Sequence, residues 1–558
     1  MENKKDQLVN VIKCAVERVA AERNVALPED FSVLLERPKR AGQGDWATST
    51  AMKLSKVFSV SPMELAGEIV KNVELGDLVA SVDVAKPGFM NFTLTNNWIV
   101  DALVNVLSHG ENYGRNNYGN GRRVQVEFVS ANPTGPIHLG HGRGAAVGDI
   151  MSSILAFSGW EVEREYYIND AGLQMENLGR STQSRYFAIL GKENQAPFPE
   201  DGYPGDYIDD IAREIIQEHG DSFIARPLDE TLDFFRDATC ERVLKMIHAD
   251  LLDFGVNFNV WFSEKSLYAD DLVQRTIERL KSRDYAYDKD GAVWFKATAF
   301  GDDKDRVMIR NNGVPTYFTS DTAYLLNKYE RKFDFLIYVW GADHHGYVPR
   351  IRSVNKALGA SDESLEFMLI QFVSLLRNGV PVSMSKRAGT FVTLRDVMDE
   401  VGRDATRFSF VNRKCDSHLD FDLEVAKQTS SDNPVYYIQY AYARICSILR
   451  EAESRGITIP DVSDVDLSVI SEPCEVRLVK EISRFPEEVL KAAQNLEPHR
   501  IAFYLTGLAE AFHSFYNTLK VLGERDDVMK ARLLLSLSSR ITIASALNLL
   551  GVTAPEKM

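Results

Sequence analysis

The stretch that most constrains the fold is residues 122–149, RRVQVEFVSANPTGPIHLGHGRGAAVGD. It begins with an apolar, β-branched run, residues 124–129, which predicts a buried strand. A loop broken by Pro133 and Pro136 follows, and small residues from about Leu139 onward open a helix. A strand, an irregular loop and a helix N-terminus in this order predict an α/β sheet that binds phosphate on unpaired N–H groups at the helix end.

Two histidines, His138 and His141, lie three residues apart at the start of this helix. Residues near that spacing share a helix face. Both can donate N–H groups to a polyphosphate whose charge shifts as phosphorus is attacked, and Gly140 between them leaves room for a flat base against the backbone. One histidine at a helix start is more often a cap or a surface residue. Two of them around a glycine, after a strand and a proline-broken loop, favour a functional site.

An alternative interpretation of the same stretch is a dinucleotide-binding loop. Gly140, Gly142 and Ala145 fit its spacing, and Glu161 and Glu163 lie about 20 residues further on, where that motif has an acid. The motif needs its first glycine in the tight turn that leaves the strand. Here about ten residues with two prolines intervene. The spacing therefore disfavours a nicotinamide or flavin enzyme.

Composition bounds the class of protein. With 558 residues, 45% of them hydrophobic and 26% charged, the chain is expected to form two to four globular domains. No apolar run approaches about 18 residues, and the first residues, MENKKDQLVNVIKC, lack an apolar core, so we expect neither a membrane span nor an export signal. The five cysteines form no C-x-x-C pair. This pattern is typical of free thiols in a reducing cytoplasm.

The net charge of −16 is an objection to a nucleic-acid partner. The distribution of charge weakens that objection, because residues 192–306 alone carry 15 Lys and Arg against 26 Asp and Glu. An acidic segment that faces solvent leaves other faces free to be locally basic. Net charge therefore does not exclude an RNA partner.

The order of apolar patterns predicts several parts. Residues 1–26 have apolar side chains at helical spacing, and with a helix over 62–72 and strand-like residues 82–94 they predict a compact α+β domain. Residues 160–170 and 335–339 are predicted strands that end in polar residues, as expected at the carboxyl edge of an α/β sheet. From about residue 396 the pattern is helical almost to the end, with no persuasive strand.

Three motifs carry a resemblance to a known family. HLGH, at residues 138–141, resembles the histidine signature of class I aminoacyl-tRNA synthetases, and its flanks in SANPTGPIHLGHGRG resemble the arginyl-tRNA synthetase version. VSMSKRAGTFVTL, at residues 382–394, resembles the lysine loop of that class, about 245 residues downstream. Asp404-Ala405-Thr406-Arg407 resembles the motif of the family's anticodon-binding domain. The resemblance to bacterial-type arginyl-tRNA synthetases covers nearly the whole chain.

The resemblance implies a fold class and a reaction. The fold is α/β, with a Rossmann-like catalytic domain over 121–395 that carries a helical insertion at about 175–300. It is preceded by an N-terminal additional α+β domain over 1–110, which contacts the tRNA elbow, and followed by an all-α anticodon-binding domain over 396–558. The implied enzyme is an arginine–tRNA ligase. It converts L-arginine and ATP to arginyl-adenylate and pyrophosphate, and it then transfers arginine to the 3′-terminal ribose of tRNA(Arg).

The resemblance also implies the conditions of that reaction. ATP enters as a substrate with Mg²⁺, and no tightly bound protein metal is expected. Arginine activation needs bound tRNA, the 2′-hydroxyl of the terminal ribose is charged, and the enzyme is a cytoplasmic monomer without membrane association.

Site residues follow from the same resemblance. The implied catalytic residues are His138, His141 and Lys386. The implied ATP-binding residues are Gly140, Gly341, Asp343 and Ser385. The implied arginine-binding residues are Ser130, Asn132, Glu264, Tyr317 and Asp321, with Glu127 as a further candidate for the α-amino group. A guanidinium is planar and permanently charged, so its burial needs carboxylates of matched geometry, which is the role implied for the two acids.

The chain departs from the class pattern in the lysine loop. Ser383 and Arg387 replace the first lysine and the last serine of that pattern. Gly135 stands where some arginyl enzymes have a compensating lysine just before the histidine signature. Our hypothesis is that Arg387 substitutes as a fork-shaped cation for phosphate.

Other interpretations remain open at this stage. A metal site at Asp343-His344-His345 is disfavoured because no fourth ligand set is in view. A synthetase for another amino acid would share both class motifs and differ at the residues that bind the side chain. A nucleotidyltransferase would leave the helical C-terminal part without a purpose. A non-catalytic tRNA-binding relative would lack His138, His141 or Lys386, and all three are present.

Overall fold

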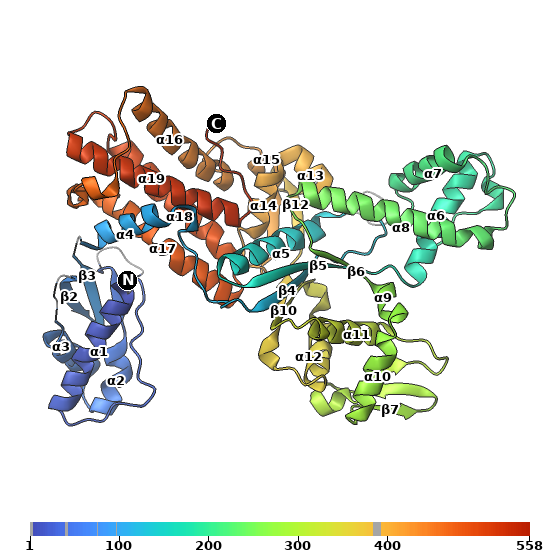
Figure 1. Ribbon diagram of the computed structural model, residues 1–558, viewed down its shortest axis with the longest axis horizontal. Helices are drawn as coiled ribbons and strands as arrows, with labels where there is room; N and C mark the ends of the chain where they lie inside the picture. Colours follow the sequence, from blue (N-terminus) through green and yellow to red (C-terminus); the bar gives the residue numbers. More distant parts are fainter. Residues whose placement is uncertain (1–3, 39–42, 75, 77, 96, 383–391) are drawn as a thin grey trace. The chain divides into compact units, whose positions relative to one another are not determined.

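The structure is a computed structural model that describes residues 4–38, 43–74, 76, 78–95, 97–382 and 392–558 (Figure 1). It divides into two compact units. Unit 1 comprises residues 1–110, 448–483 and 511–541, and unit 2 comprises residues 111–447, 484–510 and 542–558. Residues 396–558, predicted to form the C-terminal domain, contribute to both units.

The centre of unit 2 is a five-stranded parallel sheet with the order β11-β10-β4-β5-β6. Its strands are β4 (Arg123–Phe128), β5 (Glu161–Ile168), β6 (Val260–Ser263), β10 (Phe335–Gly341) and β11 (Leu365–Ile370). β5 lies on one side of β4 and β10 on the other, so the strand order reverses at the β4–β10 pair. α/β sheets bind ligands at the carboxyl ends of their strands beside such a reversal. The predicted α/β fold is confirmed.

Helix α5 (Leu139–Phe157) follows β4 and packs directly on it. A Cβ added at Gly148 would lie 2.3 Å from the Phe128 ring, so only glycine permits this approach of helix to strand. Residues 129–138 separate β4 from α5, and Gly140 lies inside the first helical turn. The dinucleotide-binding alternative needs that glycine at the exit of the strand, and the geometry therefore rules it out.

The helices that follow β5 are α6 (Leu173–Ile189), α7 (Asp206–His219) and α8 (Leu228–Asp253). After β6 come α9 (Glu264–Ala269), α10 (Leu272–Ser282), the antiparallel strands β7 (Ala286–Lys289), β8 (Ala292–Phe295) and β9 (Arg306–Ile309), and α11 (Tyr317–Glu330). β6 lies within the stretch 175–300 that the sequence assigned to one insertion, yet it pairs with β5 in the central sheet. The inserted residues therefore form two segments, and we call α6–α8 the helical insertion.

The chain continues from β10 through α12 (Val348–Ala357) and β11 to β12 (Val373–Arg377), β13 (Val380–Pro381), α13 (Leu394–Val401), α14 (Arg403–Val411), β14 (Leu419–Asp422) and α15 (Leu423–Ala426). The prediction of no strand beyond about residue 396 is wrong for β14, which pairs in parallel with β12. Leu419 and Phe421 are buried while Asp420 is exposed, which is the alternation of a short half-buried strand.

Two fully buried arginines tie α5 to later parts of unit 2. Arg407 of α14 donates hydrogen bonds to Asp149 of α5 at 2.6 Å and to the carbonyls of Phe254 and Leu550 at 3.0 Å. Arg143 donates to the carbonyls of Gln371, Lys414 and Ser417. A buried guanidinium that loses its partners is costly, so these contacts fix the position of α5.

The remainder of the C-terminal part is helical, as predicted. Its helices are α16 (Pro434–Ser454), α17 (Pro473–Asn495), α18 (His499–Thr518) and α19 (Asp526–Leu549). Parts of α17, α18 and α19 belong to each unit. Within unit 1, Arg532 donates to the buried Glu475 at 2.7 Å, which joins α19 to α17.

The N-terminal part of unit 1 is the predicted α+β domain. Helices α1 (Lys4–Glu22), α2 (Thr50–Phe58) and α3 (Pro62–Lys71) pack with an antiparallel sheet of β1 (Trp46–Thr48), β3 (Phe89–Leu94) and β2 (Val79–Ala85), and α4 (Asn97–His109) follows. The apolar face predicted for the first helix is buried, with Leu8, Ile12 and Val16 at 0% exposure. Ser61 caps α3 by accepting a hydrogen bond from the Glu64 N–H.

The contact of Gly148 with Phe128 gives a prediction about stability. Gly148→Ala places a methyl group 2.3 Å from the Phe128 ring and should lower the free energy of unfolding by about 1–3 kcal/mol, measured by urea unfolding. Gly144→Ala is the matched control in the same helix, because no atom other than those of the neighbouring helix backbone lies within 4 Å of its added Cβ. Helix propensity then makes this variant as stable as the parent or slightly more so. Equal stability of the two variants would contradict the packing argument.

Candidate functional site

The loop between β4 and α5 begins with two left-handed residues at the carboxyl edge of the sheet. Val129 has φ 68° and Ser130 has φ 40°, and this region is unfavourable for a β-branched side chain. The Ser130 hydroxyl accepts a hydrogen bond from the Tyr167 N–H at 3.1 Å and donates to Glu127 at 3.4 Å. Strained backbone of this kind persists where surrounding contacts hold it, and it is common at ligand sites.

The two histidines come together at the start of α5. Their rings are stacked, with centroids 3.7 Å apart and planes 22° from parallel. His138 is the N-cap residue, and its Nδ1 accepts a hydrogen bond from the Gly140 N–H at 3.1 Å. In the neutral ring this contact places the proton on Nε2, which is then a hydrogen-bond donor. The Gly140 N–H therefore orients the His138 ring.

The segment that follows residues 383–391 lies beside the histidines. The Leu394 N–H donates to the Ile137 carbonyl at 2.8 Å, and Thr393 forms a β-bridge with His138. Thr393 also begins α13 in a capping box with Asp396. The predicted site residues Ser385 and Lys386, together with Ser383 and Arg387, lie outside the described residues.

Polar side chains gather where β5 and β6 end. The Asn132 amide, in the β4–α5 loop, donates to Gln174 of α6 at 2.8 Å. The Asp170 carboxylate accepts from the Ser263 hydroxyl at 2.6 Å and from the Lys265 N–H at 3.1 Å. These contacts link the carboxyl ends of β4, β5 and β6. Asp170 is thereby committed to holding the start of α9.

Glu264 and Asp321 are carboxylates at the same edge. Glu264 is 3% exposed, and burial raises its pKa, although hydrogen bonds with Ser320 and Tyr167 oppose the shift. Burial also raises the pKa of Asp321 to about 7, and the negative charge of Glu264 adds to that shift. Within the part of the chain that the structure describes, neither carboxylate forms an ion pair with a lysine or arginine. The pair therefore creates a negative, poorly hydrated site.

Several further polar side chains surround these carboxylates. The Tyr347 hydroxyl donates to Asp321 at 2.5 Å. The Asn169 amide nitrogen, in the orientation that satisfies both ends of the amide, lies 2.9 Å from Glu264 Oε2. The Tyr268 hydroxyl lies 2.7 Å from the Ser320 hydroxyl. Asn169 is at the polar end of the predicted strand 160–170, which predicts its place at the carboxyl edge of the sheet, whereas the tyrosines meet the site only through tertiary packing.

Tyr317 and Asp321 lie one turn apart on α11, as their spacing predicts. The Tyr317 side chain is 62% exposed at the start of that helix. A Cβ at Gly172 would lie 3.5 Å from its hydroxyl, so the ring reaches from α11 to the loop before α6. Tyr317 is also among the groups that raise the pKa of Tyr268, after burial and the charges of Glu264 and Asp321. The four side chains are therefore neighbours.

Glu127 has a different environment from the other candidate acids. It forms a 2.5 Å ion pair with Lys328 of α11, and both side chains are buried. Burial lowers the pKa of Lys328, and the attraction of Glu127 opposes that shift. The Lys328 ammonium also lies 3.9 Å from the centroid of the Tyr338 ring. The charge of Glu127 is therefore neutralised inside the protein by Lys328.

The carboxyl end of β10 carries Gly341, Asp343, His344 and His345. The side chains of Asp343 and His344 are 61% and 60% exposed, with 3.7 Å between Asp343 Oδ2 and His344 Nε2. A Cβ at Gly341 would lie 2.4 Å from Asp343 Oδ1, so glycine allows Asp343 to fold back over the strand end. Among the described residues, no group of three or more His, Cys, Asp or Glu side chains is arranged to hold a metal ion.

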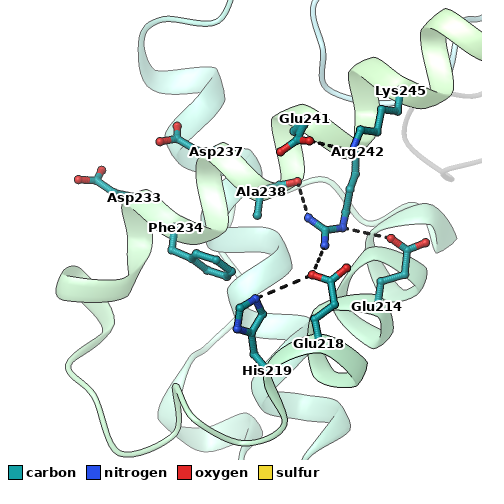
Figure 2. A pocket seen from close by; sticks show the side chains of 10 residues that line it. All are labelled: Glu214, Glu218, His219, Asp233, Phe234, Asp237, Ala238, Glu241, Arg242 and Lys245. Atoms are coloured by element: carbon teal, nitrogen blue, oxygen red, sulfur yellow. Dashed lines mark hydrogen bonds and ion pairs between the residues drawn. The ribbon is translucent and has the colours of Figure 1, made fainter.

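A separate pocket of about 700 Å³ lies in the helical insertion (Figure 2). Arg242 of α8 occupies its centre and pairs with Glu214 at 3.1 Å and Glu218 at 2.6 Å, both on α7. The Arg242 side chain also donates to the Ala238 carbonyl. These contacts show that the pocket is the polar seam between two helices, and its acidic residues contribute to the negative charge of this segment.

The site combines two features that suit two different classes of ligand. The start of α5 presents imidazole donors suited to phosphate oxygens. The β6–α11 side presents two carboxylates that form no ion pair with any described lysine or arginine, and they suit a ligand with a delocalised positive charge. The arrangement can therefore hold a polyphosphate and a cationic ligand at one sheet edge and bring them into contact.

None of the described helices combines the length and the apolar character that a membrane crossing requires.

Three family models match successive parts of the chain. They are the arginyl tRNA synthetase N terminal domain over residues 6–94, the catalytic domain of class I (R) tRNA synthetases over residues 102–428, and the DALR anticodon binding domain over residues 438–558.

Whole-chain relatives match with similar coverage. An arginine–tRNA ligase of Carboxydothermus hydrogenoformans is 48% identical over 530 residues, 95% of each chain. An arginine–tRNA ligase of Bacillus subtilis is 47% identical over 559 residues, which is 100% of this chain and 99% of the relative. The solved arginyl-tRNA synthetase of Thermus thermophilus has the same fold, with a TM-score of 0.76 over 99% of this chain and 100% of that one, at 22% identity.

The raised pKa of Asp321 predicts how stability depends on pH. A carboxyl whose pKa is higher in the folded state stabilises the fold when protonated, and this stabilisation is lost as pH rises from its unfolded value through about 7. Asp321→Asn cannot ionise, and it should gain about 2 kcal/mol in unfolding free energy relative to the parent between pH 4.5 and pH 8. Urea unfolding at both pH values measures this. Parallel pH profiles would contradict the raised pKa.

Proposed function

This chain belongs to the arginyl-tRNA synthetases, and we propose that its sheet edge holds ATP on the His138–His141 side and arginine on the Glu264–Asp321 side. The enzyme is an arginine–tRNA ligase, which activates arginine with ATP and charges tRNA. The observation that carries the assignment of sides is the difference in charge. Donors suited to phosphate lie at the helix end, and unneutralised carboxylates lie on the β6–α11 side.

Glu264 and Asp321 are proposed to bind the guanidinium group of arginine. Two carboxylates that burial has left poorly hydrated gain most from a cation that stays ionised and offers several coplanar N–H donors. The Tyr347 hydroxyl, 2.5 Å from Asp321, fixes the direction in which that carboxylate accepts. Tyr317 is exposed at the start of α11, and we propose that it covers the bound side chain. A lysine ammonium would meet only part of this planar arrangement.

The α-amino group of arginine is proposed to meet Ser130 and Asn132. Both lie on the loop after β4, and the Ser130 hydroxyl is already oriented by Tyr167 and Glu127. Glu127 itself is assigned an indirect role, because its charge is neutralised by Lys328. The backbone strain at Val129 and Ser130 then serves to turn the Ser130 hydroxyl toward the ligand.

ATP is proposed to lie over the start of α5. His138 Nε2–H would donate to the phosphates, His141 stacks against His138, and Gly140 admits the base. Gly341 and Asp343 would approach the ribose from the end of β10. Ser385 and Lys386 lie outside the described residues, and their proposed contribution of a hydroxyl and a cation to the phosphates rests on the sequence. Mg²⁺ is proposed to enter with ATP and would partly neutralise the charge of its phosphates.

The reaction follows from these positions. A carboxylate oxygen of arginine attacks the α-phosphorus of ATP, the bond to the bridging oxygen of pyrophosphate breaks, and pyrophosphate leaves. The histidine donors stabilise the charge that develops on the phosphate oxygens. A hydroxyl of the terminal ribose of tRNA then attacks the carbonyl carbon of the adenylate, and AMP leaves with the bridging oxygen. Both steps depend mainly on positioning and electrostatics.

Partners and organisation complete the proposal. We assign residues 1–110 to an N-terminal tRNA-elbow domain, 121–395 to the catalytic domain and 396–558 to the anticodon-binding domain. We also propose that arginine activation requires tRNA(Arg), that the 2′-hydroxyl is charged, and that the enzyme acts as a cytoplasmic monomer.

Exchange of pyrophosphate into ATP, measured with each of the twenty amino acids with and without tRNA, tests the proposed function. Exchange is expected with arginine alone and only when tRNA is present. Glu264→Gln and Asp321→Asn should each raise the KM for arginine about 30-fold or more, because a guanidinium would lose a buried carboxylate partner, while the KM for ATP stays near the parent value.

The pH dependence of the KM for arginine gives a further readout in the same assay. Arginine pairs with ionised Asp321, so the KM should fall as pH rises through about 7 in the parent and lose this dependence in Asp321→Asn. Glu330→Gln is the matched control, since it removes a charge from the same helix, at a carboxylate paired with Arg275. Exchange with a different amino acid would overturn the roles of Glu264 and Asp321.

A further inference from the structure

The loop that leads into the histidines is held at three points by hydrogen bonds from other segments. The Tyr166 hydroxyl of β5 donates to the Ala131 carbonyl at 2.7 Å, and the Leu394 N–H donates to the Ile137 carbonyl. Between these two points, the Tyr207 hydroxyl donates to the Thr134 carbonyl. Tyr207 belongs to α7 of the helical insertion and is 73 residues from Thr134 in sequence. It is therefore a contact from the insertion to the middle of this loop.

The start of α7 is built so that Tyr207 can reach the loop. A Cβ at Gly205 would lie 2.5 Å from the Tyr207 ring, although the Gly205 φ of −68° is open to any residue. Glycine is therefore needed at this position for space. Below the ring lies a small apolar cluster of the insertion, with Met175, Leu178, Ile208 and Cys240 at its centre and Tyr203 and Tyr207 against it. Burial raises the pKa of Tyr207, so its hydroxyl remains a donor.

Gly135 completes the contact from the side of the loop. A Cβ at this position would lie 3.1 Å from the Tyr207 hydroxyl oxygen and 3.2 Å from Cζ, and the three nearest atoms all belong to Tyr207. The ring therefore rests on the loop backbone itself. The hydroxyl and the ring of Tyr207 thus both contact residues that precede His138.

We propose that Tyr207 is a positioning residue for adenylate formation, which sets residues 134–138 and hence the direction of the His138 donor. This inference rests on the ATP-binding role proposed above for His138. It extends that role to the helical insertion: a change in the insertion alters the ATP site through one hydrogen bond and one ring contact. The insertion then contributes to catalysis without touching substrate.

The test compares two tyrosines that make the same kind of bond. Tyr207→Phe removes the hydrogen bond to Thr134 and keeps the ring. Tyr186→Phe removes a hydrogen bond from a tyrosine of the same insertion to the Gly220 carbonyl, at 2.6 Å in the parent. In the full-length enzyme with tRNA, Tyr207→Phe should raise the KM for ATP about 3- to 10-fold in pyrophosphate exchange, with the KM for arginine unchanged. Tyr186→Phe should leave both values at the parent level.

A second pair of variants tests the ring contact. Gly135→Ala should also raise the KM for ATP, because its methyl group displaces the loop from the ring. In a Tyr207→Ala background the same substitution should have no added effect, since the obstructing ring is absent. Additive effects of the two substitutions would overturn the proposed contact.

The outcomes separate this inference from the proposed function. If His138→Ala changes the KM for ATP and Tyr207→Phe does not, the positioning role of Tyr207 is wrong while the ATP site stands. If His138→Ala leaves the KM for ATP unchanged, the proposed ATP site itself is wrong. If Tyr207→Phe and Tyr186→Phe raise both KM values equally, the tyrosine has only a general structural role, and the inference is overturned.

Discussion

The direct packing of α5 on β4 is the constraint on which the rest of the site depends. Gly148 lies against the Phe128 ring with no space for a side chain, so the helix axis is fixed relative to the strand. Arg143 and Arg407, both buried, hold the same helix to segments that follow much later in the chain. The start of α5, with its two histidines, is therefore placed by a rigid scaffold while the loop before it remains strained and irregular.

Charge compensation divides the buried acids of unit 2 into two groups. Glu127 pairs with Lys328, and Glu165 pairs with Arg331 at 2.5 Å, so these acids are neutralised inside the protein. Among the residues that the structure describes, only neutral groups donate hydrogen bonds to Glu264 and Asp321, and burial raises the pKa of both. A cationic ligand would therefore stabilise the ionised form of these two carboxylates. Buried charge that is left uncompensated lowers the stability of the free protein and favours binding.

The helical insertion is a firm unit that contacts the loop before the histidines. Ion pairs of Arg242 with Glu214 and Glu218 make its helices a firm unit, and an apolar cluster supports the ring of Tyr207. The Asn132–Gln174 and Thr134–Tyr207 contacts then connect that unit to the loop before the histidines. The acidic composition that argued against an RNA partner is concentrated partly in this segment, where many of its charges pair locally.

The sequence by itself determined the strand–loop–helix unit at residues 122–149, the apolar face of α1, the helical C-terminal part and the family. Each of these depends on local periodicity or on short contiguous motifs, and both can be read from the sequence alone. Only the tertiary structure decided that β6 joins the central sheet, that β14 exists, and that Glu127 meets Lys328. It also decided which tyrosines reach Asp321 and Thr134, because those contacts join residues far apart in sequence, and no local pattern records them.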